Sequence, residues 1–227
     1  MDIRRTISVI FNLTSNTAEI EKYHTIFKWI YDNHPNQLNR WVESITPNQI
    51  KCKQWLASEL SKIIKDKSQY WNEDFYTVEI IGGWFGYPLL DYIQHLPLDL
   101  VRLIDLDPFC SQVSQKYIEL FNPEFDFKFI NQDIMSIGEH SDTRKTRFVI
   151  NTSCEHMPPM KDIVESRGYI KEKAILILQS NNKTDEPDHI NCVFSADELI
   201  DQAGCEKIYY AGEMDMGDYT RFMVIGK

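Results

Sequence analysis

The chain has 227 residues, of which 43% are hydrophobic and 26% charged, and its formal net charge is −10. This composition excludes wholesale disorder, and a chain of this length can bury a core without disulfides or a structural metal. Residues 1–70 carry ten Lys and Arg against seven Asp and Glu, whereas residues 71–227 carry fourteen against twenty-seven. The acidic larger part argues against a continuous surface for duplex DNA.

The five cysteines are odd in number and include no C-x-x-C pair, which argues against a disulfide framework and a structural zinc site. The sequence assigns no metal site. No apolar run approaches eighteen residues, and the first sixteen residues make a poor signal peptide. We therefore expect a cytoplasmic protein with no membrane partner.

Residues 1–70 are expected to form a helical N-terminal extension or lid. One helix is predicted from about residue 18 to 31. A second begins near Thr46, a candidate N-cap followed by Pro47 in the first turn. Apolar residues at helical spacing follow it, namely Leu56, Leu60, Ile63 and Ile64. The polar stretch 65–74 is expected to separate this extension from a second region, residues 71–227.

From Tyr76 onward, short apolar runs alternate with helical stretches. Strands are predicted at 77–81, 101–106, 127–133, 148–153, 174–180, 207–213 and 219–227. This alternation predicts an α/β fold with a doubly wound, mostly parallel, seven-stranded Rossmann-like sheet. The last strand is expected to pair antiparallel, because only a tight loop separates it from the strand before.

Polar residues and glycines follow four of these strands. Gly82, Gly83 and Gly86 come after the first strand, and Asp105 ends the second. Ligands of doubly wound sheets bind beyond the carboxyl ends of the strands, where a carboxylate can accept hydrogen bonds from a ribose diol. Trp84 argues against a dinucleotide, because a bulky residue in this loop keeps backbone away from a pyrophosphate.

These segments together resemble the class I S-adenosylmethionine-dependent methyltransferases over residues 76–227. The resemblance rests on VEIIGGWFG (78–86), LIDLDP (103–108), NQDI (131–134) and VINTSCEHM (149–157). It implies that S-adenosylmethionine is the cofactor, that the glycine loop holds its methionyl end, and that Asp105 holds its ribose. It further implies that Leu106 packs on adenine, that Asp133 accepts from the adenine amine, and that residues 151–156 face the methyl group. The full cofactor-binding set expected is Glu79, Gly82, Gly83, Trp84, Gly86, Asp105, Leu106, Asp133, Ile134 and Asn151.

The chemistry expected at this site is an in-line displacement at an activated sulfonium, driven mainly by positioning. A base is needed only for a poorly nucleophilic acceptor that carries a proton, and His156 is the first candidate and Glu155 the second. Cys154 is a poor candidate nucleophile, because nothing nearby in sequence lowers its pKa. Residues 151–160 contain no aromatic side chain to stack on a flipped base, which disfavours amino methylation of DNA.

Side chains outside the sheet also bear on the site. Gln49, Lys51, Lys53 and Trp55 on the second predicted helix are candidates to face the cofactor, with Lys53 pairing with the methionyl carboxylate. The alternative is that Trp55 is core and the lysines are solvated. His189 follows the fifth strand, at a place where the resemblance implies contacts with the acceptor. The alternative is that His189 is an ordinary loop histidine.

The sequence thus favours methyl transfer to a small molecule, peptide or RNA. Two alternatives stay open: an S-adenosylmethionine-using enzyme of another reaction type, such as an aminocarboxypropyl transferase or lyase, and a non-catalytic nucleotide-binding partner protein. The acceptor and the oligomeric state are not determined by these residues.

Overall fold

The structure is a computed structural model, and it describes residues 16–67, 75–137, 145–169 and 173–227. The predicted boundary between residues 70 and 71 lies outside the described residues, as do the first fifteen residues. The helices are α2 (Thr17–Asn33), α3 (Leu38–Ser44), α4 (Pro47–Lys67), α5 (Leu89–Ile93), α6 (Pro108–Phe121), α7 (Met160–Arg167) and α9 (Ala196–Ala203). Short 3-10 turns are η1 (Pro35–Gln37), η3 (Ile134–Ser136) and η4 (Cys154–His156).

Seven strands form one sheet in the order β3-β2-β1-β4-β5-β7-β6. They are β1 (Tyr76–Ile81), β2 (Leu98–Ile104), β3 (Asp126–Ile130), β4 (Thr146–Asn151), β5 (Ile175–Asn181), β6 (Ile208–Asp215) and β7 (Thr220–Gly226). Strands β1 to β5 pair in parallel, and β7 pairs antiparallel with both β5 and β6. The predicted α/β fold class and the antiparallel last strand are confirmed.

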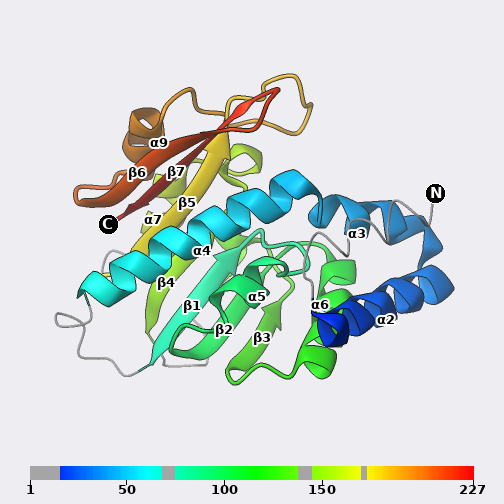
Figure 1. Cartoon of the computed structure of the whole chain (residues 1–227). Helices are drawn as coiled ribbons and strands as arrows, with labels where there is room; N and C mark the ends of the chain where they lie inside the picture. Colours follow the sequence, from blue (N-terminus) through cyan, green and yellow to red (C-terminus); the bar gives the residue numbers. More distant parts are fainter. Residues whose placement is uncertain (1–15, 68–74, 138–144, 170–172) are drawn as a thin grey trace.

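Helices cover both faces of the sheet (Figure 1). In one core, helices α2, α3, α4, α5 and α6 pack against alternate strand residues such as Val78, Leu103 and Ile150. A second core joins α7 and α9 with the residues that point the other way, such as Val149 and Leu176. Side chains of a strand alternate between its two faces, so consecutive apolar residues are buried on both sides.

The N-terminal helices pack into the first of these cores. Tyr23, Ile26 and Ile30 repeat at helical spacing on α2 and are fully buried. The predicted start of α4 is confirmed, since the Gln49 amide donates to the Thr46 hydroxyl across 3.4 Å. Figure 1 shows α4 crossing in front of the sheet. No helix among the described residues is long and apolar enough to cross a membrane.

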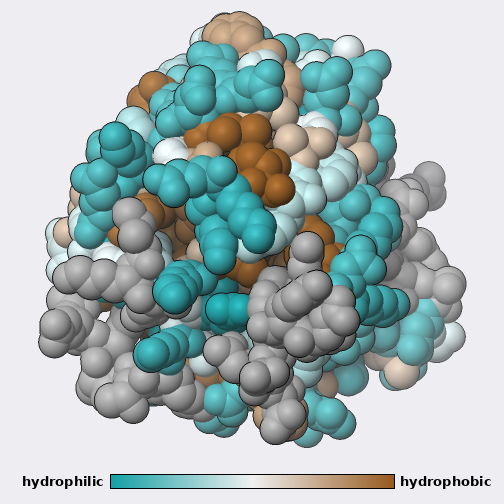
Figure 2. All heavy atoms as spheres, turned by 90° about the vertical axis from the view of Figure 1, so that its left-hand side faces the viewer, coloured by the Kyte–Doolittle hydropathy of each residue, from teal (hydrophilic) through white to brown (hydrophobic). Residues whose placement is uncertain are grey.

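A cavity of about 580 Å³ lies at the amino-terminal ends of the parallel strands. It is lined by parts of α7, α9 and the start of β5. Figure 2 shows this side of the molecule, where apolar side chains gather in the middle of the face and hydrophilic ones surround them. None of the predicted site residues lines this cavity.

Candidate functional site

A second cavity, of about 300 Å³, lies where the carboxyl ends of β1, β2 and β4 meet. The strand order reverses between β1 and β4, which is where open α/β sheets bind their ligands. The predicted site residues that line it are Gln49, Lys53, Gly82, Trp84, Asp105, Thr152, Ser153, Glu155 and His156. Its other lining residues are Met157, Asp188 and Arg221.

The glycine loop after β1 packs closely against its neighbours at its glycine positions. A Cβ on Gly82 would lie 2.0 Å from Cε of Met157, and one on Gly83 would lie 2.2 Å from Cδ1 of Leu103. Gly82 and Gly86 also have φ of +58° and +81°, values that favour glycine. The three glycines therefore let the loop lie against β2 and against the loop after β4.

Asp105 is fixed at the cavity wall by backbone hydrogen bonds. Its Oδ2 accepts from the Trp84 amide at 2.9 Å, and its Oδ1 accepts from the Asp107 amide at 3.0 Å. Burial raises the pKa of Asp105, an effect that these two hydrogen bonds oppose. Asp107 in turn pairs with Arg40 of α3 across 2.5 Å. The predicted ribose-binding carboxylate thus has a defined direction and links the glycine loop to β2.

Glu79 lies within the sheet and is not among the residues that line the cavity. Its carboxylate pairs with Arg102 at 3.0 Å, accepts from the Thr146 hydroxyl at 2.8 Å, and accepts from the Tyr169 hydroxyl. Arg102 is its partner in register on β2. The structure therefore gives this predicted cofactor-binding residue a set of buried partners inside the protein.

Asn151 ends β4 and is likewise turned inward. The side chain is fully buried, accepts from the Ser153 amide at 2.9 Å, and contacts the sulfurs of Met157 and Met160 at 3.3 Å. It closes the turn after β4 and lies outside the lining of the cavity.

The predicted adenine-binding residues lie at the ends of β2 and β3, outside the lining of the cavity. Leu106 is 68% exposed, which leaves its side chain available to a planar ring. Asp133 accepts from the Met135 amide at 2.9 Å, and Ile134 is buried in the second core.

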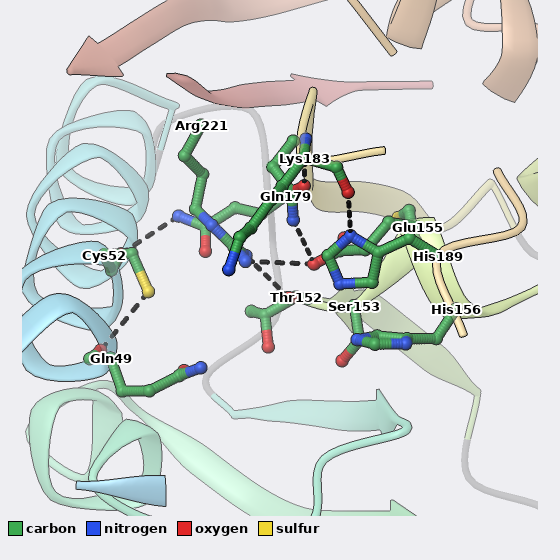
Figure 3. Close-up of polar contacts among 12 residues, drawn as sticks. Gln49, Cys52, Thr152, Ser153, Glu155, His156, Gln179, Lys183, His189 and Arg221 are labelled. Atoms are coloured by element: carbon green, nitrogen blue, oxygen red, sulfur yellow. Dashed lines mark hydrogen bonds and ion pairs between the residues drawn. The ribbon is translucent and has the colours of Figure 1, made fainter. Parts of the chain in front are cut away.

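Glu155 and Arg221 form a buried ion pair behind the cavity. Oε1 of Glu155 lies 3.0 Å from Nη2 of Arg221 and accepts from the Asn181 amide at 2.6 Å. Figure 3 shows Glu155 and Arg221, whose contact joins the turn after β4 to β7. The neighbouring Cys154 is buried, which raises the pKa of its thiol and agrees with its being a poor candidate nucleophile.

His156 and His189 come together at the outer part of the site. Their rings meet edge to face with centroids 4.6 Å apart. Nδ1 of His156 lies 3.1 Å from a carboxylate oxygen of Asp188, and its side chain is 36% exposed. The loop after β5 is tied to this position because the Asn191 amide donates to the Glu155 carbonyl at 3.0 Å.

Helix α4 supplies one wall of the cavity. Lys53 and Gln49 face it and are joined by a hydrogen bond of 2.5 Å (Figure 3 shows Gln49). Burial lowers the pKa of the Lys53 ammonium. Gln179 of β5 donates to the Cys52 carbonyl at 2.9 Å, which attaches this part of α4 to the sheet.

The other two candidates on α4 have different partners. Lys51 donates to the carbonyl of Asp215 at 3.0 Å, and Trp55 donates to the hydroxyl of Tyr210 at 3.0 Å. Both contacts join α4 to β6, so these side chains hold the helix on the sheet and do not line the cavity.

Three lining residues, Met157, Asp188 and Arg221, were given no role by the sequence. Arg221 is charged and nearly fully buried in an apolar strand, YTRFMVIG, and such a position needs a partner. That pattern is a usable signal. Asp188 stands in a polar loop, where nothing distinguishes it from its neighbours.

In sequence, the chain matches no protein-family model and no curated protein. Solved structures do share its fold. Magnesium protoporphyrin IX methyltransferase from Synechocystis, with bound S-adenosylmethionine, is 17% identical with a TM-score of 0.57, over 89% of this chain and 96% of that one. A S-adenosylmethionine-dependent methyltransferase from Clostridium acetobutylicum is 10% identical with a TM-score of 0.57, over 86% and 99%.

A protein named as a cyclase, and not as a methyltransferase, has the same fold. The cyclase SpnF is 10% identical with a TM-score of 0.51, over 74% of this chain and 80% of that one. The chain therefore has the class I S-adenosylmethionine-dependent methyltransferase fold. Its chemistry has to be argued from its own residues.

Proposed function

We propose that the protein binds S-adenosylmethionine in the cavity at the ends of β1, β2 and β4 and transfers its methyl group to an acceptor. The observation that carries this proposal is Asp105, held beside the glycine loop at the switch point of a methyltransferase-type sheet. The Synechocystis enzyme of the same fold holds S-adenosylmethionine, and a second structure of it holds S-adenosylhomocysteine.

The cofactor would lie across the strand ends with its ribose at Asp105. Each carboxylate oxygen of Asp105 accepts one backbone hydrogen bond and keeps capacity for another, so a ribose diol can bind without displacing the loop. The exposed Leu106 offers an apolar surface to adenine, and Asp133 stands at the next strand end. Lys53, which lines the same cavity as Gly82, would pair with the methionyl carboxylate.

Methyl transfer needs the acceptor, the methyl carbon and the sulfur in line, and rigid placement supplies most of the acceleration. His156 lines the cavity and is partly exposed, so it lies where an acceptor enters. Glu155 already pairs with Arg221 and Asn181, which favours a positioning role for it over that of a free base. The acceptor would be a small molecule, a peptide or RNA.

Isothermal titration calorimetry of the whole chain tests the proposal. S-adenosylmethionine and S-adenosylhomocysteine should each bind with one site per chain, and NAD should not bind. Absence of binding by both sulfur nucleosides would refute the proposal.

The likeness to SpnF favours testing one alternative, an enzyme of the same fold that does not transfer a methyl group. Product analysis separates methyl transfer from aminocarboxypropyl transfer and from a non-catalytic role. Methyl transfer yields S-adenosylhomocysteine, aminocarboxypropyl transfer yields methylthioadenosine, and a non-catalytic partner protein consumes no cofactor.

A further inference from the structure

We propose that Glu155, His156 and His189 bind one divalent transition-metal cation at the acceptor side of the cavity. One ligand atom from each side chain lies within 4.8 Å of the other two. Figure 3 shows the three side chains gathered on one side of the cavity, across from α4. The metal binding stands on these residues alone, whereas its part in methyl transfer rests on the proposed function.

The first supporting observation is an unused oxygen on a buried carboxylate. Glu155 is 2% exposed. Its Oε1 accepts from Asn181 and Arg221, but its Oε2 is buried and has no hydrogen-bond partner among the described residues. A buried carboxylate oxygen left unpaired is costly, and a cation bound to Oε2 would remove that cost.

The second observation is the orientation of both imidazoles. Nδ1 of His189 lies 2.5 Å from the Lys183 carbonyl oxygen, which can only accept, so Nδ1 carries the hydrogen. Nδ1 of His156 faces the carbonyl and carboxylate oxygens of Asp188, at 3.3 and 3.1 Å, and it also donates. In the neutral imidazoles each Nε2 then keeps a free lone pair.

Metal-binding histidines in proteins have this arrangement. Their second ring nitrogen donates to a carboxylate or a backbone carbonyl, which fixes the tautomer and the ring orientation. Here the carboxylate is that of Asp188 and the carbonyl is that of Lys183. The Nε2 atom of each histidine, which makes no hydrogen bond with the described residues, is therefore oriented by the Nδ1 contact and available to a metal ion.

Two imidazoles and one carboxylate select the class of cation. Imidazole suits zinc, cobalt and iron, whereas magnesium and calcium prefer oxygen ligands. Catalytic zinc sites with two His and one Glu keep a fourth position open for water or substrate. A tetrahedral cation with bonds of about 2.1 Å holds its ligands about 3.4 Å apart, so ligand atoms that now lie within 4.8 Å of one another would have to draw closer when it binds. Neither histidine is buried, so both side chains have room to turn.

The open position would face the cavity, because Glu155, His156 and Asp188 line it. A cation held there would lower the pKa of a bound acceptor hydroxyl, which would give its proton to water. Its oxygen then attacks the methyl carbon while the carbon–sulfur bond breaks and its electron pair stays on the sulfur. Glu155 and His156 would thus act on the acceptor through the cation, and the acceptor atom would be an oxygen.

Cobalt is the probe for the site, because Co²⁺ bound by imidazoles absorbs visible light. The purified chain, freed of metal, is titrated with Co²⁺ and followed by absorbance and calorimetry. We expect one Co²⁺ per chain. His156→Asn and His189→Asn should each weaken Co²⁺ binding at least tenfold, and His24→Asn, an exposed histidine on α2, should leave it unchanged.

The inference is overturned if the wild-type chain binds no Co²⁺, or if either site variant, shown by circular dichroism to be folded, keeps wild-type affinity. Calorimetry with S-adenosylhomocysteine in the presence of a chelator tests the proposed function separately. Nucleoside binding without Co²⁺ binding rejects only the metal site. Co²⁺ binding without nucleoside binding supports the metal site and rejects the proposed function.

Discussion

Oε1 of Glu155 lies 3.0 Å from Nη2 of Arg221, and both side chains are at most 5% exposed. This pair joins η4, just after β4, to β7 and forms the back of the cavity. Removing one partner of a buried pair leaves an uncompensated charge, which costs far more than losing a surface pair.

Arg221→Met should therefore lower the free energy of unfolding by about 3–5 kcal/mol, measured by urea denaturation. The matched control is Lys28→Met, which breaks the exposed pair of Lys28 with Asp32 at 2.5 Å and should cost about 0–1 kcal/mol. Equal costs for the two variants would show that the Glu155–Arg221 pair does not stabilise the back of the cavity.

Asp105→Ala should weaken binding of S-adenosylhomocysteine tenfold or more, because hydrogen bonds to a charged group contribute about 1.5–3 kcal/mol. Calorimetry measures the affinity. Asp201→Ala, at an exposed position on α9, is the control and should bind as the wild type does. Unchanged affinity in a folded Asp105→Ala variant would remove Asp105 from the site.

Lys53→Met should weaken binding of S-adenosylhomocysteine but not of methylthioadenosine, which lacks the amino-acid carboxylate that Lys53 is proposed to hold. Lys51→Met is the control, since Lys51 lies two residues away and contacts Asp215 instead. A variant that loses affinity for both nucleosides equally would argue that Lys53 supports the shape of the cavity and not the carboxylate.

Asp91 predicts a pH effect on stability that is separate from the site. Burial raises its pKa to about 7, and the hydroxyls of Tyr23 and Tyr117 donate to its carboxylate. A pKa above the unfolded value means that the folded protein binds the proton more tightly. Its stabilising contribution is therefore complete below about pH 4 and is lost as the pH rises through about 7.

Asp91→Asn removes this dependence. Between pH 5 and pH 7, the free energy of unfolding of the wild type should fall relative to that of the variant by up to about 1.4 kcal/mol per pH unit. Urea denaturation of both proteins at several pH values measures the difference. Parallel curves for the two proteins would contradict the raised pKa.

Parts of the site that depend only on strand order were predictable from the sequence. Gly82, Asp105 and His156 each follow a parallel strand, and such strand ends meet at one edge whatever the details of packing. The sheet itself was predictable for the same reason, since its strands are continuous apolar runs.

Features set by contacts between distant segments were not predictable. Glu79 stands close to the end of β1, yet its partner Arg102 on β2 holds its carboxylate inside the protein. Arg221 lies 66 residues after Glu155 in the sequence, and the two meet only because β7 inserts beside β5.

The most direct test of the central claim is a crystal structure of the chain with S-adenosylhomocysteine. The account predicts the ribose hydroxyls within hydrogen-bond distance of Asp105, the adenine beside Leu106 and Asp133, and the homocysteine end between the glycine loop and Lys53. A nucleoside bound elsewhere, or side chains of α4 filling the strand ends in its place, would contradict it.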